Sequence, residues 1–174
     1  MKVVVRVGSV RVAQILAGVD DGGVDVASLP QRLVSACAQA LPVTGAALML
    51  MTDDGPGGTV AVTDPTAGTM EELQFTLGEG PCVESSGTGR PVLQPDLART
   101  GPARWPGFAA AALEAGIGAI FALPLRVGGI RLGVLDLYRD AVGELSADEL
   151  ETTGVDSNRA TARDNGGTMS QQSK

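Results

Sequence analysis

Residues 122–138, ALPLRVGGIRLGVLDLY, decide the fold. Two apolar runs flank the pair Gly128–Gly129, and two glycines between such runs are a typical signal for a two-residue β-hairpin turn. Both runs are apolar on both alternating faces. A strand of that kind has to be covered on both of its faces. The stretch therefore predicts two antiparallel strands with helices on either side.

The rest of the chain supplies further strands and helices for this hairpin. Apolar runs predict strands at 44–51 and 59–63, joined by a turn cluster at 53–58. The prolines of 91–97 favour an edge or irregular strand, because proline has no N–H for a ladder. Helices are expected over 28–41, 68–75 and 105–116. The pattern predicts an α+β fold, an antiparallel sheet of five or six strands with helices on both faces.

The two ends of the chain differ in character. Val12, Ile15, Leu16 and Val19 have the spacing of an amphipathic helix over 9–19. Ser146 and Glu149 form a capping box that starts a last helix. From residue 153 the sequence is polar and aperiodic, which predicts a disordered tail. We therefore expect an N-terminal extension at 1–8, one domain at 9–152, and a tail at 153–174 with no output domain.

Composition excludes several classes of function. The 174 residues carry 13 basic and 20 acidic side chains, a net charge of −7, and no histidine. Without histidine there is no Ser–His–Asp or Cys–His nucleophile and no histidine-ligated haem or zinc. The acidic balance disfavours direct nucleic-acid binding, and no run reaches the roughly 18 apolar residues of a membrane span. The two cysteines are expected to be reduced thiols in a cytoplasmic protein.

Two motifs together resemble a known family. The hairpin at 122–138 pairs a Pro-Leu strand with a GVL strand, and residues 77–97 read LGEGPCVESSGTGRPVLQPDL. Over about 9–152 the chain resembles a GAF domain, with a GAF/PAS-like fold. The second motif is similar to the GAF type found upstream of ANTAR RNA-binding domains in bacterial antitermination regulators.

The resemblance implies a module that senses a small molecule or signal and dimerises through its terminal helices. Its ligand cavity would lie against one face of the sheet, under residues 65–115. On this basis the ligand is an unidentified small molecule. The candidate cavity residues are Phe75, Cys82, Val92, Trp105, Phe108 and Phe121.

Cys82 follows Pro81, a residue suited to the first turn of a helix. A helix N-terminus favours a thiolate, whereas Glu79 and Glu84 oppose it by like charge. We therefore expect no strong activation, although Cys82 should react faster than Cys37, which lies in an apolar helical stripe. Val83 stands where bilin-binding members of the family carry histidine. No catalytic residue, metal site or cofactor is expected.

Asp136 interrupts the apolar strand between Leu135 and Leu137. A buried carboxylate needs a partner, and Arg126 or Arg131 is expected to provide one in a structural pair.

These observations favour a non-catalytic sensor in which a ligand shifts the arrangement of the terminal helices. The chain would form a weak homodimer and pass its signal to a separate output protein, or it would be a truncated antitermination-type regulator. Neither a membrane nor a nucleic acid is expected as a direct partner. Two alternatives stay open at this stage: a thiol-dependent free methionine sulfoxide reductase, and a pure dimerisation module with a collapsed cavity.

Overall fold

The expected hairpin forms the centre of the structure. In the computed structural model, which describes residues 29–127 and 130–152, β4 (Ala119–Val127) pairs antiparallel with β5 (Ile130–Arg139). β1 (Gly45–Thr52) pairs with the other side of β5. The edges are β2 (Gly55–Val62) and β3 (Val92–Gln94), which gives the strand order β2-β1-β5-β4-β3. The predicted α+β class with an antiparallel sheet is confirmed, and the sheet has five strands.

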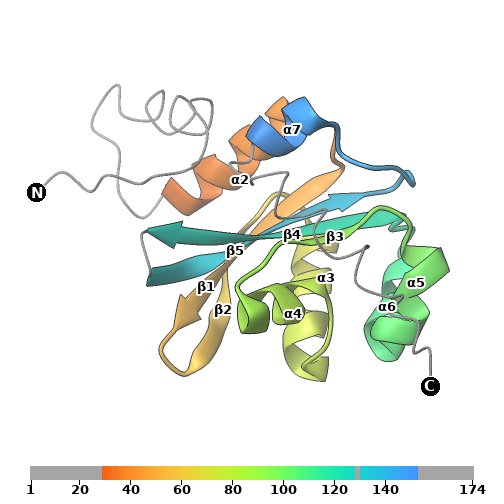
Figure 1. Ribbon diagram of the computed structural model, residues 1–174, viewed down its shortest axis with the longest axis horizontal. Helices are drawn as coiled ribbons and strands as arrows, with labels where there is room; N and C mark the ends of the chain where they lie inside the picture. The colour runs from red at the N-terminus through yellow and green to blue at the C-terminus, as the bar shows by residue number, and fades with distance from the viewer. Residues whose placement is uncertain (1–28, 128–129, 153–174) are drawn as a thin grey trace, which may run out of the picture.

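Helices cover both faces of this sheet (Figure 1). On one face lie α2 (Leu29–Ala40) and α7 (Ala147–Thr152), which come from opposite ends of the described chain and pack on the same apolar cluster. The other face carries four helices: α3 (Pro65–Leu77), α4 (Pro81–Thr88), α5 (Leu97–Arg104) and α6 (Pro106–Glu114). None of the helices in the described ranges has the length and apolar character that crossing a membrane requires.

Side-chain alternation along β5 divides the core in two. Leu135 and Leu137 pack with Val34 of α2 in one apolar cluster. Val134 and Tyr138 belong to the other cluster, with Phe108 of α6. Because successive side chains of a strand point to opposite faces, Asp136 points the same way as Val134 and Tyr138. The strand therefore directs a carboxyl group into the layer that holds α3 to α6.

Two local expectations were wrong. Residues 55–58 were expected in a turn, yet β2 begins at Gly55, with register shifts against β1 at Leu48/Met49 and Leu50/Met51. An edge strand tolerates such irregular pairing around glycine and proline. Helix α5 was not anticipated, because Pro102 lies inside it. It starts at the N-cap Asp96, whose side chain accepts a hydrogen bond from Arg99 N at 3.3 Å.

The capping box of the last helix is confirmed. Glu149 Oε2 accepts from Ser146 N at 2.7 Å, and Ser146 Oγ accepts from Glu149 N at 3.2 Å. Leu145, just before the cap, packs into the same cluster as α2. The expected helix at 9–19, the extension at 1–8 and the tail at 153–174 lie outside the described residues.

Candidate functional site

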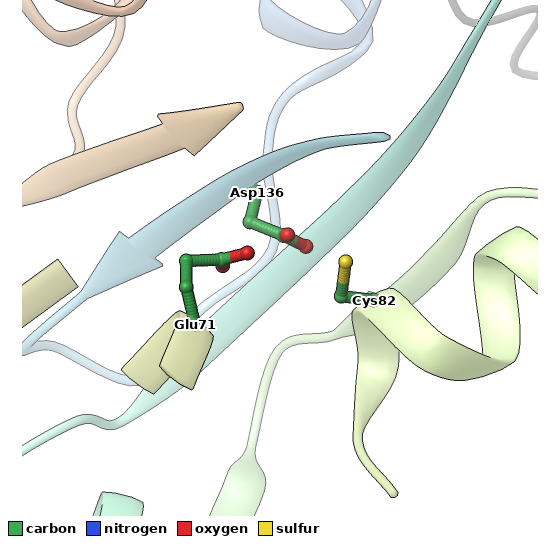
Figure 2. A group of neighbouring side chains, drawn as sticks. All are labelled: Glu71, Cys82 and Asp136. Carbon is green, nitrogen blue, oxygen red and sulfur yellow. The ribbon is translucent and has the colours of Figure 1, made fainter. Parts of the chain in front are cut away.

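A cluster of polar and sulfur-containing side chains lies buried between the sheet and helices α3 and α4. We call Glu71 and Gln74 of α3, Cys82 of α4, and Asp136 and Tyr138 of β5 the buried polar cluster. Glu71 is 3% exposed, Cys82 is 1% exposed and Asp136 is fully buried. Figure 2 shows that the carboxyl groups of Glu71 and Asp136 and the sulfur of Cys82 point toward one another.

Local sequence explains how α3 and α4 present these groups. Asp64 caps α3, since its Oδ1 accepts from Ala67 N at 2.9 Å. Glu71 and Gln74 then stand three residues apart and share one face of the helix. The turn into α4 needs glycine at position 80, where φ is +134° and an added Cβ would lie 2.3 Å from Gln74 Oε1. This close approach places the Gln74 amide at the start of α4.

Hydrogen bonds join four members of the cluster in a chain. The backbone N–H of Cys82 donates to Gln74 Oε1 at 2.8 Å. Gln74 Nε2 donates to the Tyr138 hydroxyl at 3.0 Å, and that hydroxyl donates to Glu71 Oε1. Each donor in this chain has an acceptor, so Glu71 is held in a fixed orientation from the sheet side.

Asp136 is the exception. Neither of its carboxyl oxygens has a hydrogen-bond partner in the described part of the chain. Arg131, one of the expected partners, instead donates to the backbone oxygen of Ser86 at 2.7 Å. The predicted pair with Arg131 is therefore wrong, and the side chain of Arg126, the other expected partner, lies outside the described part of the chain. Most buried polar side chains have a partner, and the groups beside this carboxyl are the acids Glu71 and Cys82 rather than a cation, which makes it the feature of the cluster that needs an explanation.

Burial and mutual repulsion disfavour the charged forms of these groups. Burial raises the pKa of Asp136 well above its ordinary value, and the neighbouring Glu71 raises it further. Burial also raises the pKa of Glu71. The pKa of the Cys82 thiol is raised first by burial and then by Asp136 and Glu71. In the ligand-free chain, the Cys82 sulfur is therefore a neutral thiol rather than a reactive thiolate.

The two cysteines lie on opposite sides of the sheet. Cys37 packs in the cluster under α2 and Cys82 in the cluster under α3 to α6. Both are buried, and burial raises the pKa of Cys37 to about 11. The structure gives no basis for the expected faster reaction of Cys82, because the start of α4 is packed against the sheet and Cys82 is as buried as Cys37. A disulfide between the two would have to pass through the sheet.

The candidate cavity residues do not all gather here. Cys82, Val92, Trp105 and Phe108 share one core cluster. Phe121 packs on the other side of the sheet, in the cluster of α2. Phe75 is 61% exposed.

Glu71, Gln74 and Tyr138 were not identified from the sequence, although a glutamate and a glutamine three residues apart on a short helix were visible signals. A separate open cleft of about 820 Å³ lies between the β1–β2 turn and α4, and Arg131 lines it.

Three groups of the cluster have the chemistry of metal ligands. The ligand atoms of Glu71, Cys82 and Asp136 all lie within 4.8 Å of one another. Met49 adds a second sulfur, with its Sδ 3.5 Å from Cys82 Sγ. Carboxylate and thiolate groups bind cations, so the absence of histidine does not prevent a metal site here.

Solved structures share this fold at low sequence identity. The GAF domain of a phosphoenolpyruvate-protein phosphotransferase from Acinetobacter aligns with a TM-score of 0.61 and 14% identity, over 82% of each chain. A domain of a candidate two-component sensor histidine kinase protein from Sinorhizobium meliloti aligns with a TM-score of 0.58 and 14% identity, over 75% of this chain and 83% of that one.

A free methionine-R-sulfoxide reductase from Neisseria meningitidis, solved with its substrate, aligns with a TM-score of 0.57 and 17% identity, over 83% of this chain and 81% of that one. At these identities the likeness concerns the fold alone. The comparison with curated proteins found no match.

A sequence model of the GAF domain matches residues 24–154. This range contains every helix and strand from α2 to α7, including the buried polar cluster. The matched range and the shared architecture lead to one conclusion: this chain belongs to the GAF domain family.

Proposed function

We propose that this GAF domain is a non-catalytic sensor whose ligand site is the buried polar cluster. The observation that carries the proposal is Asp136, a fully buried carboxyl group without a partner that is directed at Glu71 and Cys82. A core built for stability alone would place an apolar side chain there. A ligand with a positive or hydrogen-donating group would give Asp136 the partner that the described residues do not supply.

β5 offers a route from this site to the terminal helices. Asp136 and Tyr138 point to the ligand side, while Leu135 and Leu137 on the same strand pack against the layer of α2 and α7. A ligand that binds one arrangement of β5 more tightly shifts the population toward it. The signal would then leave through α2 and α7, to a second subunit or to a separate output protein, as in the antitermination-type relatives that the sequence resembles.

A thermal-shift screen of small molecules tests this proposal, with Asp136→Asn as the matched variant. A ligand of the native state raises the melting temperature as its concentration exceeds Kd. We expect compounds that stabilise the wild type and fail to stabilise Asp136→Asn. Compounds that stabilise both proteins equally would place the site elsewhere, for example in the open cleft beside Arg131.

A reductase of free methionine sulfoxide is the second candidate, favoured by the shared fold with proteins of that activity. Such chemistry uses one thiol to attack the sulfoxide and another to resolve the oxidised product. Here the two thiols lie on opposite faces of the sheet, which supports the sensor instead. Thiol-dependent turnover of methionine sulfoxide by the wild type, lost in Cys82→Ser, would establish the enzyme and overturn the proposal.

A dimerisation module with a closed cavity is the third candidate. Trp105, Phe108 and Tyr138 are each at most 4% exposed and fill much of this side of the core. The same thermal-shift screen separates this candidate from the sensor, because a closed cavity would bind none of the compounds in a way that depends on Asp136.

A further inference from the structure

We propose that Glu71, Cys82 and Asp136 bind a single divalent transition-metal ion, with zinc as the reference case. This inference rests on the proposed function, because it names the class of ligand that the same site would take. The ligand atoms of the three side chains converge within 4.8 Å (Figure 2). They come from α3, α4 and β5, so an ion among them would join two helices to the central sheet.

The unpartnered carboxyl is what separates this cluster from an ordinary group of acidic residues. Both oxygens of Asp136 lack a partner in the described chain, and the side chain is fully buried. Its neighbours across the sheet are Ala47 on β1 and Ala122 on β4. Both cross-strand neighbours are small, and among the described residues no arginine forms a hydrogen bond with the carboxyl.

The donor atoms indicate which metal would bind. Two carboxylates alone would suit magnesium or calcium, which prefer oxygen ligands. A cysteine sulfur shifts the preference toward zinc and other late first-row ions. Met49 Sδ, 3.5 Å from Cys82 Sγ, adds a second soft donor on the same side. A fourth ligand would be this thioether or a water molecule.

The distances require only a modest contraction. In a tetrahedral zinc site with metal–oxygen and metal–sulfur bonds of roughly 2.1 and 2.3 Å, ligand atoms stand about 3.5 Å apart. Since no two of these ligand atoms are more than 4.8 Å apart, the three groups need to close by at most about 1.3 Å, a movement that side-chain rotation can supply. The chain from Cys82 N–H through Gln74 and Tyr138 to Glu71 already fixes the orientation of one carboxylate, as outer partners do in metal sites.

Binding would exchange protons for the ion. Cys82 would lose its thiol proton to solvent as the sulfur–metal bond forms, and a protonated carboxyl of the pair would lose its proton in the same way. No electron is transferred, and no co-reactant is needed. The ion takes the place of these two protons among the buried acids, and because it binds the folded state its binding should stabilise the folded chain.

The test uses the full chain, freed of metal with a chelator and then dialysed. Zinc is titrated by calorimetry, and cobalt(II) is titrated as a spectroscopic probe, because a cobalt–thiolate bond gives a near-ultraviolet charge-transfer band. We expect one ion per chain and a band that depends on Cys82. Cys82→Ser and Asp136→Asn should weaken zinc binding by at least the roughly 10–100-fold that loss of an outer partner costs.

Cys37→Ser is the matched control, because Cys37 is equally buried but lies on the other side of the sheet. It should leave the stoichiometry and the cobalt band unchanged. Circular dichroism checks that each variant is folded. Asp136→Asn, which keeps the shape of the side chain, decides the question if Cys82→Ser fails to fold.

The inference is overturned if zinc binds equally well to wild type and Asp136→Asn, since the ion would then sit on surface acids. It is also overturned if no cobalt–thiolate band appears. If the band is absent but an organic compound stabilises the protein in a way that requires Asp136, the metal inference fails and the proposed sensor function stands. If neither the cobalt–thiolate band nor such a compound is found, both the metal inference and the proposed sensor function fail.

Discussion

Replacing Asp136 with asparagine should stabilise the metal-free protein, and the gain should grow with pH. Burial and the neighbouring Glu71 raise the pKa of Asp136, whereas in the unfolded chain an aspartate titrates near pH 3.9. Above that pH the folded state therefore holds more protons than the unfolded state. Between the unfolded and the folded pKa of Asp136, the free energy of unfolding falls as pH rises, because the folded state has to bind a proton that becomes scarcer in solution. Asparagine keeps the size of the side chain and cannot ionise.

The size of this stability difference follows from the number of protons that the folded state retains. Each pH unit within the window costs about 1.4 kcal/mol for one retained proton. Between pH 4 and pH 7 the accumulated penalty is therefore at most about 4 kcal/mol, if the carboxyl keeps its proton throughout. Glu71 titrates with Asp136 as a pair, so some of the slope remains in the variant. The groups facing Asp136 are Glu71 from α3, Cys82 from α4 and Tyr138 on β5 itself, and none of them supplies a positive charge.

Urea unfolding followed by circular dichroism measures the free energy of unfolding of wild type and Asp136→Asn, at pH values from 4 to 8 with EDTA present. The two proteins should be similar near pH 4 and diverge as pH rises, with Asp136→Asn the more stable. The exposed Asp53, changed to asparagine, controls for the loss of one negative charge. A stability difference that does not change with pH, or a variant less stable than wild type at pH 7, would refute the reasoning.

Three further predictions concern the turn into α4, the thiols and the partners. Gly80→Ala should destabilise the chain by about 1–3 kcal/mol, because φ is +134° and the new methyl would meet Gln74 Oε1. Urea unfolding measures this loss of stability. Gly87→Ala, whose new methyl meets no neighbouring atom, is the control. Cys37 and Cys82 should both label slowly with a thiol reagent in the native protein and rapidly in urea; fast native labelling of either would contradict its burial. The chain should sediment as a weak dimer, and a strict monomer would contradict the sensor proposal as stated. Because its net charge is −7, it should show no sequence-specific gel shift with RNA, and such a shift would contradict the proposal too.

Much of the sheet could be predicted because its signals are local. Gly128–Gly129 between two apolar runs predicts the β4–β5 hairpin, and period-two alternation places Asp136 and Tyr138 on one face. The capping box likewise joins Ser146 to Glu149, which is only three residues further along the chain. Each of these features depends on neighbours along the chain, so the sequence alone contains the relevant information.

The site could not be predicted in the same way, because its members meet only after packing. Glu71 contacts Tyr138, a residue 67 positions later. Glu71 and Glu72 are adjacent glutamates, yet the first is buried and the second is exposed. Nothing in their local sequence distinguishes them. The rotation of α3 about its own axis decides which one enters the core, and that rotation is set by what the sheet presents to the helix.

Helix α3 buries two polar side chains next to the apolar Ala67 and Met70, and this supports a functional origin for the cluster. It buries Glu71 and Gln74 while Phe75 is 61% exposed and Leu77 is 46% exposed. Burying a large apolar side chain is worth roughly 1.5–3 kcal/mol, and Glu71 and Gln74 occupy two buried positions of α3 that do not contribute such a gain. Hydrogen bonds to Tyr138 and Cys82 recover part of it, at about 1 kcal/mol each. Neither of these hydrogen bonds involves the carboxyl group of Asp136. Local rules of this kind are broken mainly where a protein binds or reacts, and here the broken rules on α3 and β5 converge on the same three ligand atoms.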